Sequence, residues 1–326
     1  MARIALDAMG GDHAPLETVL GALDAAARGV DVVLVGDRVA LQAVLDDQGG
    51  DLPIVDAPDV IGMDEDPATA IREKKGASVT VAARLVAEGE AAGMVSAGST
   101  GAALAAAAIV IGRIRGVARP AIATIFPIGD GTVLLDAGAN IEVKPEHLFQ
   151  FGLMGSVVAE VYLDIAEPTV GLLNIGEEAS KGRELERAAH AQLAASGIRF
   201  VGNVEGRDVG RGVADVFVTD GFTGNVLLKT AEGIARLVSR LVLESVATDE
   251  DEAVQQAAQL ILPKLLGLRE RLDPEAYGGA HLVGSRGTVV IAHGSSSRVA
   301  IANALSLAAE GADRGLVQRI EAAIRG

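Results

Sequence analysis

The chain has 326 residues, of which 49% are hydrophobic and 2% aromatic, and it carries 28 Lys and Arg against 44 Asp and Glu. This length and apolar content can fill a core, so we expect a folded chain and not a disordered one. The formal net charge of −16 repels a phosphate backbone and argues against nucleic-acid binding. Cysteine is absent, which excludes disulfides, thiolate metal sites and cysteine nucleophiles.

The N-terminus predicts a core strand and not a leader peptide, because its first apolar run breaks at Asp7. The most apolar stretch, residues 102–111, is much shorter than the roughly 20 residues that cross a bilayer. We therefore expect no transmembrane helix and a cytoplasmic protein.

A short apolar run followed by a loop of glycine and small polar residues occurs six times. The runs begin at Ile4, Gly93, Thr132, Val170, Asp215 and Thr288. Continuous apolar runs predict strands buried on both faces, and helical patterns lie between most of them. We therefore expect a single three-layer α/β/α domain over residues 1–326 with a mostly parallel sheet. All six loops should then lie at one carboxyl edge, where open α/β sheets bind ligands.

Residues 224–273 depart from this pattern and predict a hairpin of two long helices joined by the acidic link 248–252. Apolar residues such as Ile234, Leu237 and Leu241 keep a helical period, and Pro263 should end or kink the second helix. Two interpretations of the apolar surface stay open. It packs on the core or on a dimer mate, or it contacts lipid or an acyl chain.

Several familiar motifs are missing. The sequence has no GxxxxGK[ST], GxSxG or HExxH, and no GxGxxG after its first strand, which argues against nucleotide hydrolysis, serine-hydrolase chemistry and an ordinary dinucleotide site. The five histidines lack the spacing of metal ligands. They are His13, His147, His190, His281 and His293. We expect neither a metal nor an organic cofactor.

Two loops carry groups suited to an anion, and two more carry an aspartate. The segment 96–101 joins a strand to an Ala-rich helix, which predicts either an anion cradle at a helix N-terminus or a turn with a Ser or Thr cap. Lys181 precedes a predicted helix, where a bound anion would explain its position and a solvated surface lysine is the alternative. For Asp7 and Asp136, bracing a buried loop is at least as good an explanation as catalysis.

Several longer strings then carry a family resemblance. They are DAMGGDHAP (7–15), SAGSTGA (96–102), RPA (119–121), DAGAN (136–140), GLLNIGEEASKG (171–182), FVGNVEGRD (200–208), DGFTGNVLLKTAEG (220–233), GGAHLVG (278–284) and HGSS (293–296). In this order they resemble the bacterial phosphate acyltransferases of phospholipid synthesis, the PlsX family, whose fold is similar to phosphotransacetylases and isopropylmalate dehydrogenases. The resemblance implies synthesis of acyl phosphate from inorganic phosphate and acyl-(acyl carrier protein), which feeds a membrane acyltransferase that acylates glycerol 3-phosphate. Two positions depart from the family pattern: Ser99 replaces Asn, and His281 replaces Pro.

The implied chemistry needs no enzyme nucleophile, because a phosphate oxygen attacks and a thiol leaves. The protein must position two anionic reactants and stabilise an oxyanion. The resemblance assigns Lys181 to holding phosphate and Asn225 to polarising the thioester carbonyl or orienting phosphate. His13 either protonates the leaving sulfur or braces its loop. Further candidates for binding phosphate or substrate are Gly10, Gly11, Ser96, Gly98, Ser99, Thr100, Gly101, Asn140, Asp220 and Thr223.

The expected partners are acyl carrier protein and a second copy of the chain. Such carriers are acidic, so docking on an acidic enzyme needs a local basic patch. Two clusters are candidates: Lys264, Arg269 and Arg271 on the second hairpin helix, and Arg113, Arg115 and Arg119. The first could instead meet anionic lipid headgroups in peripheral membrane contact, or be a solvated face. Two other functions stay open: a phosphotransacetylase-type enzyme that uses acyl-CoA, and a non-catalytic lipid-binding scaffold.

Overall fold

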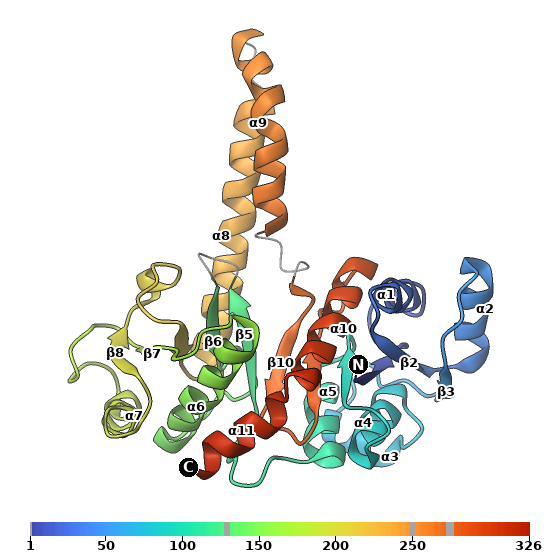
Figure 1. Cartoon of the computed structure of the whole chain (residues 1–326), viewed down its shortest axis with the longest axis horizontal. Coiled ribbons are helices and arrows are strands. Elements are labelled where there is room, and N and C mark those ends of the chain that lie inside the picture. Colours follow the sequence, from blue (N-terminus) through green and yellow to red (C-terminus); the bar gives the residue numbers. More distant parts are fainter. Residues whose placement is uncertain (1, 127–130, 248–251, 272–276) are drawn as a thin grey trace.

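The computed structural model describes residues 2–126, 131–247, 252–271 and 277–326, except the side chains of 246–247, 252–254, 256 and 268–271. One eleven-stranded sheet runs through the body in the order β3-β2-β1-β4-β11-β10-β5-β6-β9-β7-β8 (Figure 1). The strands are β1 (Arg3–Asp7), β2 (Asp31–Gly36), β3 (Ile54–Asp56), β4 (Gly93–Ser96), β5 (Ala121–Phe126), β6 (Thr132–Leu135), β7 (Val170–Leu173), β8 (Phe200–Val204), β9 (Val216–Val218), β10 (Ala280–Val283) and β11 (Thr288–Ile291).

Helices cover both faces of this sheet. They are α1 (Leu16–Ala27), α2 (Arg38–Gln48), α3 (Pro67–Glu73), α4 (Ser78–Glu88), α5 (Thr100–Ala106) with a π-helical turn (Ala107–Ile111), α6 (Pro145–Tyr162), α7 (Glu184–Ala194), α8 (Gly221–Ala247), α9 (Glu252–Arg271), α10 (Arg298–Asp313) and α11 (Leu316–Arg325). In β1, Ile4 and Leu6 join the core cluster of α1 and α10, whereas Ala5 joins that of α4 and α5. The predicted three-layer α/β/α fold is therefore confirmed, since strands covered on both faces need apolar residues at every position.

All six predicted runs form strands, and seven of the ten strand pairings are parallel. The expectation that their loops share one edge is wrong. β10 runs antiparallel to both β11 and β5, and β5 runs antiparallel to β6. Because of these three antiparallel pairings, β6, β9 and β7 run opposite to β1, β4 and β11. The loops after β1, β4 and β11 therefore lie at one edge of the sheet and those after β6, β9 and β7 at the other.

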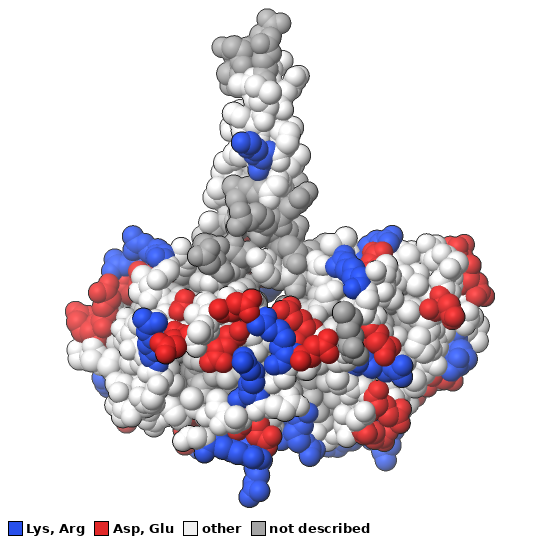
Figure 2. Space-filling view, in the orientation of Figure 1, with Lys and Arg blue, Asp and Glu red and all other residues white. Residues whose placement is uncertain are grey.

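The helical hairpin is formed by α8 and α9, which project together from the body (Figure 1). Pro263 does not end the second helix, because α9 continues through it to Arg271, and the alternative expectation of a kink stays a prediction. Most of the acidic link, residues 248–251, lies outside the described residues. Figure 2 shows charged side chains over the body and few on the described hairpin surface in this view. No helix among the described residues is both long and apolar enough to cross a bilayer.

His281 is the unusual residue of the core. It lies on β10 with 2% of its surface exposed, and its ring stacks on Tyr162 at a centroid distance of 4.6 Å. Neither ring nitrogen has a hydrogen-bond partner. Burial lowers the pKa of His281 to about 3, because the charged imidazolium is disfavoured away from water.

We therefore predict that His281→Leu reduces the loss of stability in mild acid. Below the ordinary histidine pKa of about 6.5, the unfolded chain binds a proton at His281 that the folded chain does not bind. The unfolding free energy of the wild type therefore decreases as the pH is lowered from 6.5 to about 3. Between pH 7.5 and 5.5, the wild type should lose about 1.4 kcal/mol more unfolding free energy than the variant. Urea denaturation at both pH values measures this difference, and equal losses would contradict the assignment.

Candidate active site

A cavity of about 590 Å³ opens on the face of the sheet beside β5. The β5 residues Ile122, Thr124, Ile125 and Phe126 line it, and the first, second and fourth of these share one face of the strand. The first turns of α8 form a second side, and the start of α5 with the loop between β11 and α10 forms a third. The side chains from these elements include Thr100, Asn225, Leu228, Lys229, Glu232, Arg236, His293, Ser295 and Ser296. The cavity thus joins apolar surface to hydroxyl, amide, imidazole and cationic groups.

Asp136 organises the loop that follows β6. Its fully buried carboxylate accepts hydrogen bonds from the backbone N–H of Ile122 at 3.0 Å, of Gly138 at 3.1 Å and of Ala139 at 3.0 Å. The second oxygen accepts from the backbone N–H and side-chain amide of Asn140 at 2.7 and 2.9 Å. Every one of these donors belongs to the protein, so Asp136 is a loop brace, as one of the two sequence interpretations held.

The loop that Asp136 braces sets the position of α8. The backbone N–H of Gly221 donates to the carbonyl of Asn140 at 2.7 Å, and a Cβ on Gly224 would overlap the carbonyl oxygen of Asp136. Only glycine permits this approach. One residue further on, the Asn225 amide nitrogen would lie 3.2 Å from a Cβ on Gly138. Asn225 and Gly138, which come from two of the predicted loops, therefore share the cavity wall.

At the other edge of the sheet, the loops after β1 and β4 are tied together by Asp7 and Ser96. The Ser96 hydroxyl donates to Asp7 at 2.6 Å and accepts the backbone N–H of Gly98 at 3.1 Å. A Cβ on Gly10 would meet Asp7 Oδ2 at 2.6 Å. Burial raises the pKa of Asp7, although hydrogen bonds from Ser78 and Ser96 oppose the shift. The structure thus shows bracing by Asp7, Ser96 and Gly10.

Other predicted binding residues are also occupied by contacts within the chain. Ser99 accepts the backbone N–H of Ala102 at 3.4 Å and so caps α5. Asp220 accepts the backbone N–H and the hydroxyl of Thr223, at 2.8 and 2.9 Å, and pairs with Arg183 at 2.9 Å. Of the further candidates for binding phosphate or substrate that were predicted from the sequence, only Thr100 lines the cavity.

Lys181 and His13 lie outside the cavity wall. Lys181 is exposed in the loop after β7, where the side-chain amide of Asn174 donates to its carbonyl at 3.2 Å. His13 is exposed in a smaller neighbouring pocket, whose residues include Ser295, a residue that also lines the cavity. The roles assigned to Lys181 and His13 from the sequence therefore stay predictions.

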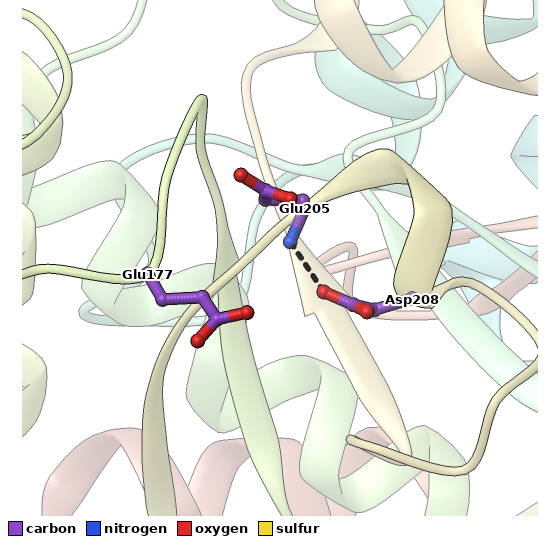
Figure 3. A group of neighbouring side chains, drawn as sticks. All are labelled: Glu177, Glu205 and Asp208. Atoms are coloured by element: carbon purple, nitrogen blue, oxygen red, sulfur yellow. Dashed lines mark hydrogen bonds between the residues drawn. The ribbon is translucent and has the colours of Figure 1, made fainter.

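A group of carboxylates near the loop after β7 was missed by the sequence analysis. Glu177, Glu205 and Asp208 place ligand oxygens within 4.8 Å of one another (Figure 3). Such oxygens suit a hard divalent cation. Arginine already balances part of their charge, since Arg207 pairs with Glu205 at 2.7 Å and with Glu177 at 3.4 Å. Glu205 and Asp208 are three residues apart, but Glu177 lies in a different loop, so no motif could reveal the group.

The docking residues expected on the hairpin are only partly described. Lys264 is exposed on α9, and the side chains of Arg269 and Arg271 lie outside the described part of the structure. Lys229 and Arg236 of α8 also line the cavity, although neither was predicted from the sequence to bind substrate. Both residues lie within the regular pattern of a long helix, whereas the binding residues were predicted from glycine-rich loops.

We predict that Gly224→Ala destabilises the protein, because the added methyl group overlaps the Asp136 carbonyl. Gly233→Ala in the same helix is the matched control, since nothing lies within 4 Å of its added methyl group. Urea denaturation should show a loss of about 1–3 kcal/mol for Gly224→Ala and a gain of about 0.5–1 kcal/mol for the control. Equal stabilities for the two variants would exclude this contact as a constraint on α8.

Comparison with known proteins places the chain in a family. A family profile described as "Fatty acid synthesis protein" matches residues 2–319. Two curated relatives are called "Phosphate acyltransferase". The protein from Desulforamulus reducens is 50% identical, and the match covers 98% of this chain and 97% of that protein. The protein from Heliobacterium modesticaldum is 49% identical, and the match covers 99% of this chain and 98% of that protein.

Solved structures support the fold. A phosphotransacetylase from Streptococcus pyogenes matches with a TM-score of 0.63 at 17% identity, covering 96% of this chain and 94% of that one. A 4-hydroxythreonine-4-phosphate dehydrogenase from Klebsiella pneumoniae matches with a TM-score of 0.54 at 15% identity, covering 94% and 98%. The extent of the profile match and the identity to the curated relatives show that this chain belongs to the fatty acid synthesis protein family.

Proposed function

We propose that this chain is a phosphate acyltransferase that moves an acyl group from acyl-(acyl carrier protein) to inorganic phosphate. The acyl phosphate formed would serve phosphatidic acid synthesis by a membrane glycerol-3-phosphate acyltransferase. The curated relatives carry the name phosphate acyltransferase. The observation in the structure that supports the proposal most is the cavity, which combines apolar walls with polar groups from separate loops.

The apolar part of the cavity suits the end of a fatty acyl chain. Ile122, Phe126 and Leu228 contribute branched or aromatic surface there, and burying such surface against a methylene chain contributes about 0.8 kcal/mol per CH₂. The polar part suits the reacting groups, because Thr100 offers a hydroxyl and Asn225 an amide. We assign Asn225 to the thioester carbonyl or the phosphate, whose charges develop or change during transfer.

Lys181 is the proposed phosphate-holding cation, on the basis of its family string alone. Its loop is joined to the start of α8 by the ion pair between Arg183 and Asp220, so it lies on a segment connected to the helix that carries Asn225. Lys229 and Arg236 supply further positive charge on the cavity wall. Lys229 is paired with Glu232 at 3.0 Å, which leaves Arg236 as the more available of these two.

The hairpin supports a second part of the proposal, a homodimer with peripheral membrane contact. Its apolar side chains are unusually exposed: Ile234 by 56%, Leu241 by 53% and Leu260 by 79%. Such contiguous apolar surface is typical of a partner or a membrane interface. Lys264 on the same hairpin is a candidate contact for the acidic carrier protein or for anionic headgroups.

We predict that the purified protein forms acyl phosphate from acyl-carrier protein in a phosphate-dependent manner, with a higher kcat/KM than from the matching acyl-CoA. Detection of acyl phosphate as its hydroxamate measures both reactions. Higher kcat/KM with acyl-CoA would instead support the phosphotransacetylase-type activity. No phosphate-dependent product from either donor would overturn the proposed function.

We also predict that Asn225→Ala lowers kcat by about 10²-fold, the loss usual for a donor to a developing oxyanion. Lys181→Ala should raise the KM for phosphate, because a charge-assisted contact to the anion is lost. Thr230→Ala is the control, since Thr230 is exposed on α8 and does not line the cavity. Unchanged turnover in both Asn225→Ala and Lys181→Ala, with loss of function in hairpin variants, would favour the non-catalytic scaffold.

A further inference from the structure

His293 follows β11 in the loop that leads to α10, and the fold places this loop against the other two loops at its edge of the sheet. β11 pairs in parallel with β4, and the backbone N–H of Ala292 donates to the carbonyl of Ser96 at 2.9 Å. The carbonyl of Gly294 accepts the backbone N–H of Asp12 at 2.7 Å. His293 lines the same cavity as Thr100 and Asn225.

The contacts of His293 determine where its proton lies. The backbone N–H of Ser295 donates to His293 Nδ1 at 3.3 Å, and the Ser295 hydroxyl lies 2.8 Å from the same nitrogen. A backbone N–H can only donate, so Nδ1 must accept and the proton of the neutral ring lies on Nε2. In the described part of the structure, Nε2 has no hydrogen-bond partner.

We propose that His293 is a further catalytic residue, a neutral donor whose Nε2–H stabilises the oxyanion formed on the acyl carbonyl. The inference rests on the proposed function. An oxygen of hydrogen phosphate forms a bond to the thioester carbon, and the carbonyl electron pair moves onto its oxygen. His293 donates a hydrogen bond to that oxygen without releasing its proton. Collapse restores the carbonyl, breaks the C–S bond, and the proton lost by hydrogen phosphate goes to the sulfur.

This role fits the tautomer of His293 better than proton transfer does. A neutral imidazole that gave up its Nε2 proton would become a strongly basic imidazolate, so it is a poor acid for a thiolate. As a fixed donor it needs no proton transfer and adds no charge that would hold the ground-state phosphate too tightly. It also complements Asn225, which lines the same cavity, because an oxyanion hole is built from several positioned donors.

The decisive variants are His293→Ala and His293→Gln. His293→Ala should lower kcat by roughly 10²–10³-fold, whereas His293→Gln should recover most of this loss because its amide supplies an uncharged N–H. Ser295→Ala should lose clearly less activity than His293→Ala, since the backbone N–H that fixes the ring is kept. His190→Gln is the control, because His190 lies on α7 outside the cavity wall. A loss in Ser295→Ala as large as in His293→Ala would instead indicate a serine–histidine nucleophile pair and overturn the proposal.

Two further measurements separate the donor role from other roles. The deficit of His293→Ala should be the same with a carrier thioester and with an aryl thioester, whose leaving thiol is more acidic. A deficit that shrinks with the aryl donor would indicate a general acid. In ¹⁵N-histidine-labelled wild type, the ring signal absent from His293→Gln should show its proton on Nε2 at pH 7.5, and a proton on Nδ1 would contradict the geometry. This NMR signal can be measured without turnover. An inactive wild type would reject the proposed function. An active wild type with fully active His293 variants would reject only this inference.

Discussion

The carboxylate of Asp136 is the interaction on which the candidate site depends. It accepts hydrogen bonds from backbone N–H groups of β5 and of its own loop at 2.7–3.1 Å, and it is completely buried. An unsatisfied buried carboxylate would be very costly, so these donors fix the loop in one conformation. The ordered loop then provides the surface on which Gly221 and Gly224 seat α8. Asn225 reaches the cavity because α8 begins there.

The reversal of strand direction explains why the cavity lies on a face of the sheet. In a fully parallel sheet, ligand loops gather at one carboxyl edge. Here β5, β6 and β10 introduce three antiparallel pairings, and the loops divide between two edges. Residues of β5 form the floor that connects them. Thr100 and His293 enter this cavity from one edge of the sheet, whereas Gly138 enters from the loop at the other.

The sequence predicted those features that depend on local composition. Continuous apolar runs identified six buried strands because both faces of each are covered, and Gly-rich strand ends identified the loops that supply Thr100 and Asn225. The direction of β5 and β10 could not be predicted in this way, since it depends on pairing between segments far apart in the chain. His293 was not selected as a site residue, because it was weighed only as a metal ligand and as part of the HGSS string, although its contact with Ser295 two residues later is local. Asp220 and Ser99 were predicted to bind substrate, but their side chains make contacts within the chain. Capping and ligand binding use the same polar side chains, so the sequence does not distinguish the two roles.

The continuity of α8 links the chemistry to the outer surface of the molecule. Its 27 residues correspond to a rod about 40 Å long, with Asn225 in its second turn and the exposed hairpin at its far end (Figure 1). The helix has no proline along this length. The exposed hairpin and the amide of Asn225 therefore lie on one continuous helix, so a single structural element forms part of both the cavity wall and the outer surface.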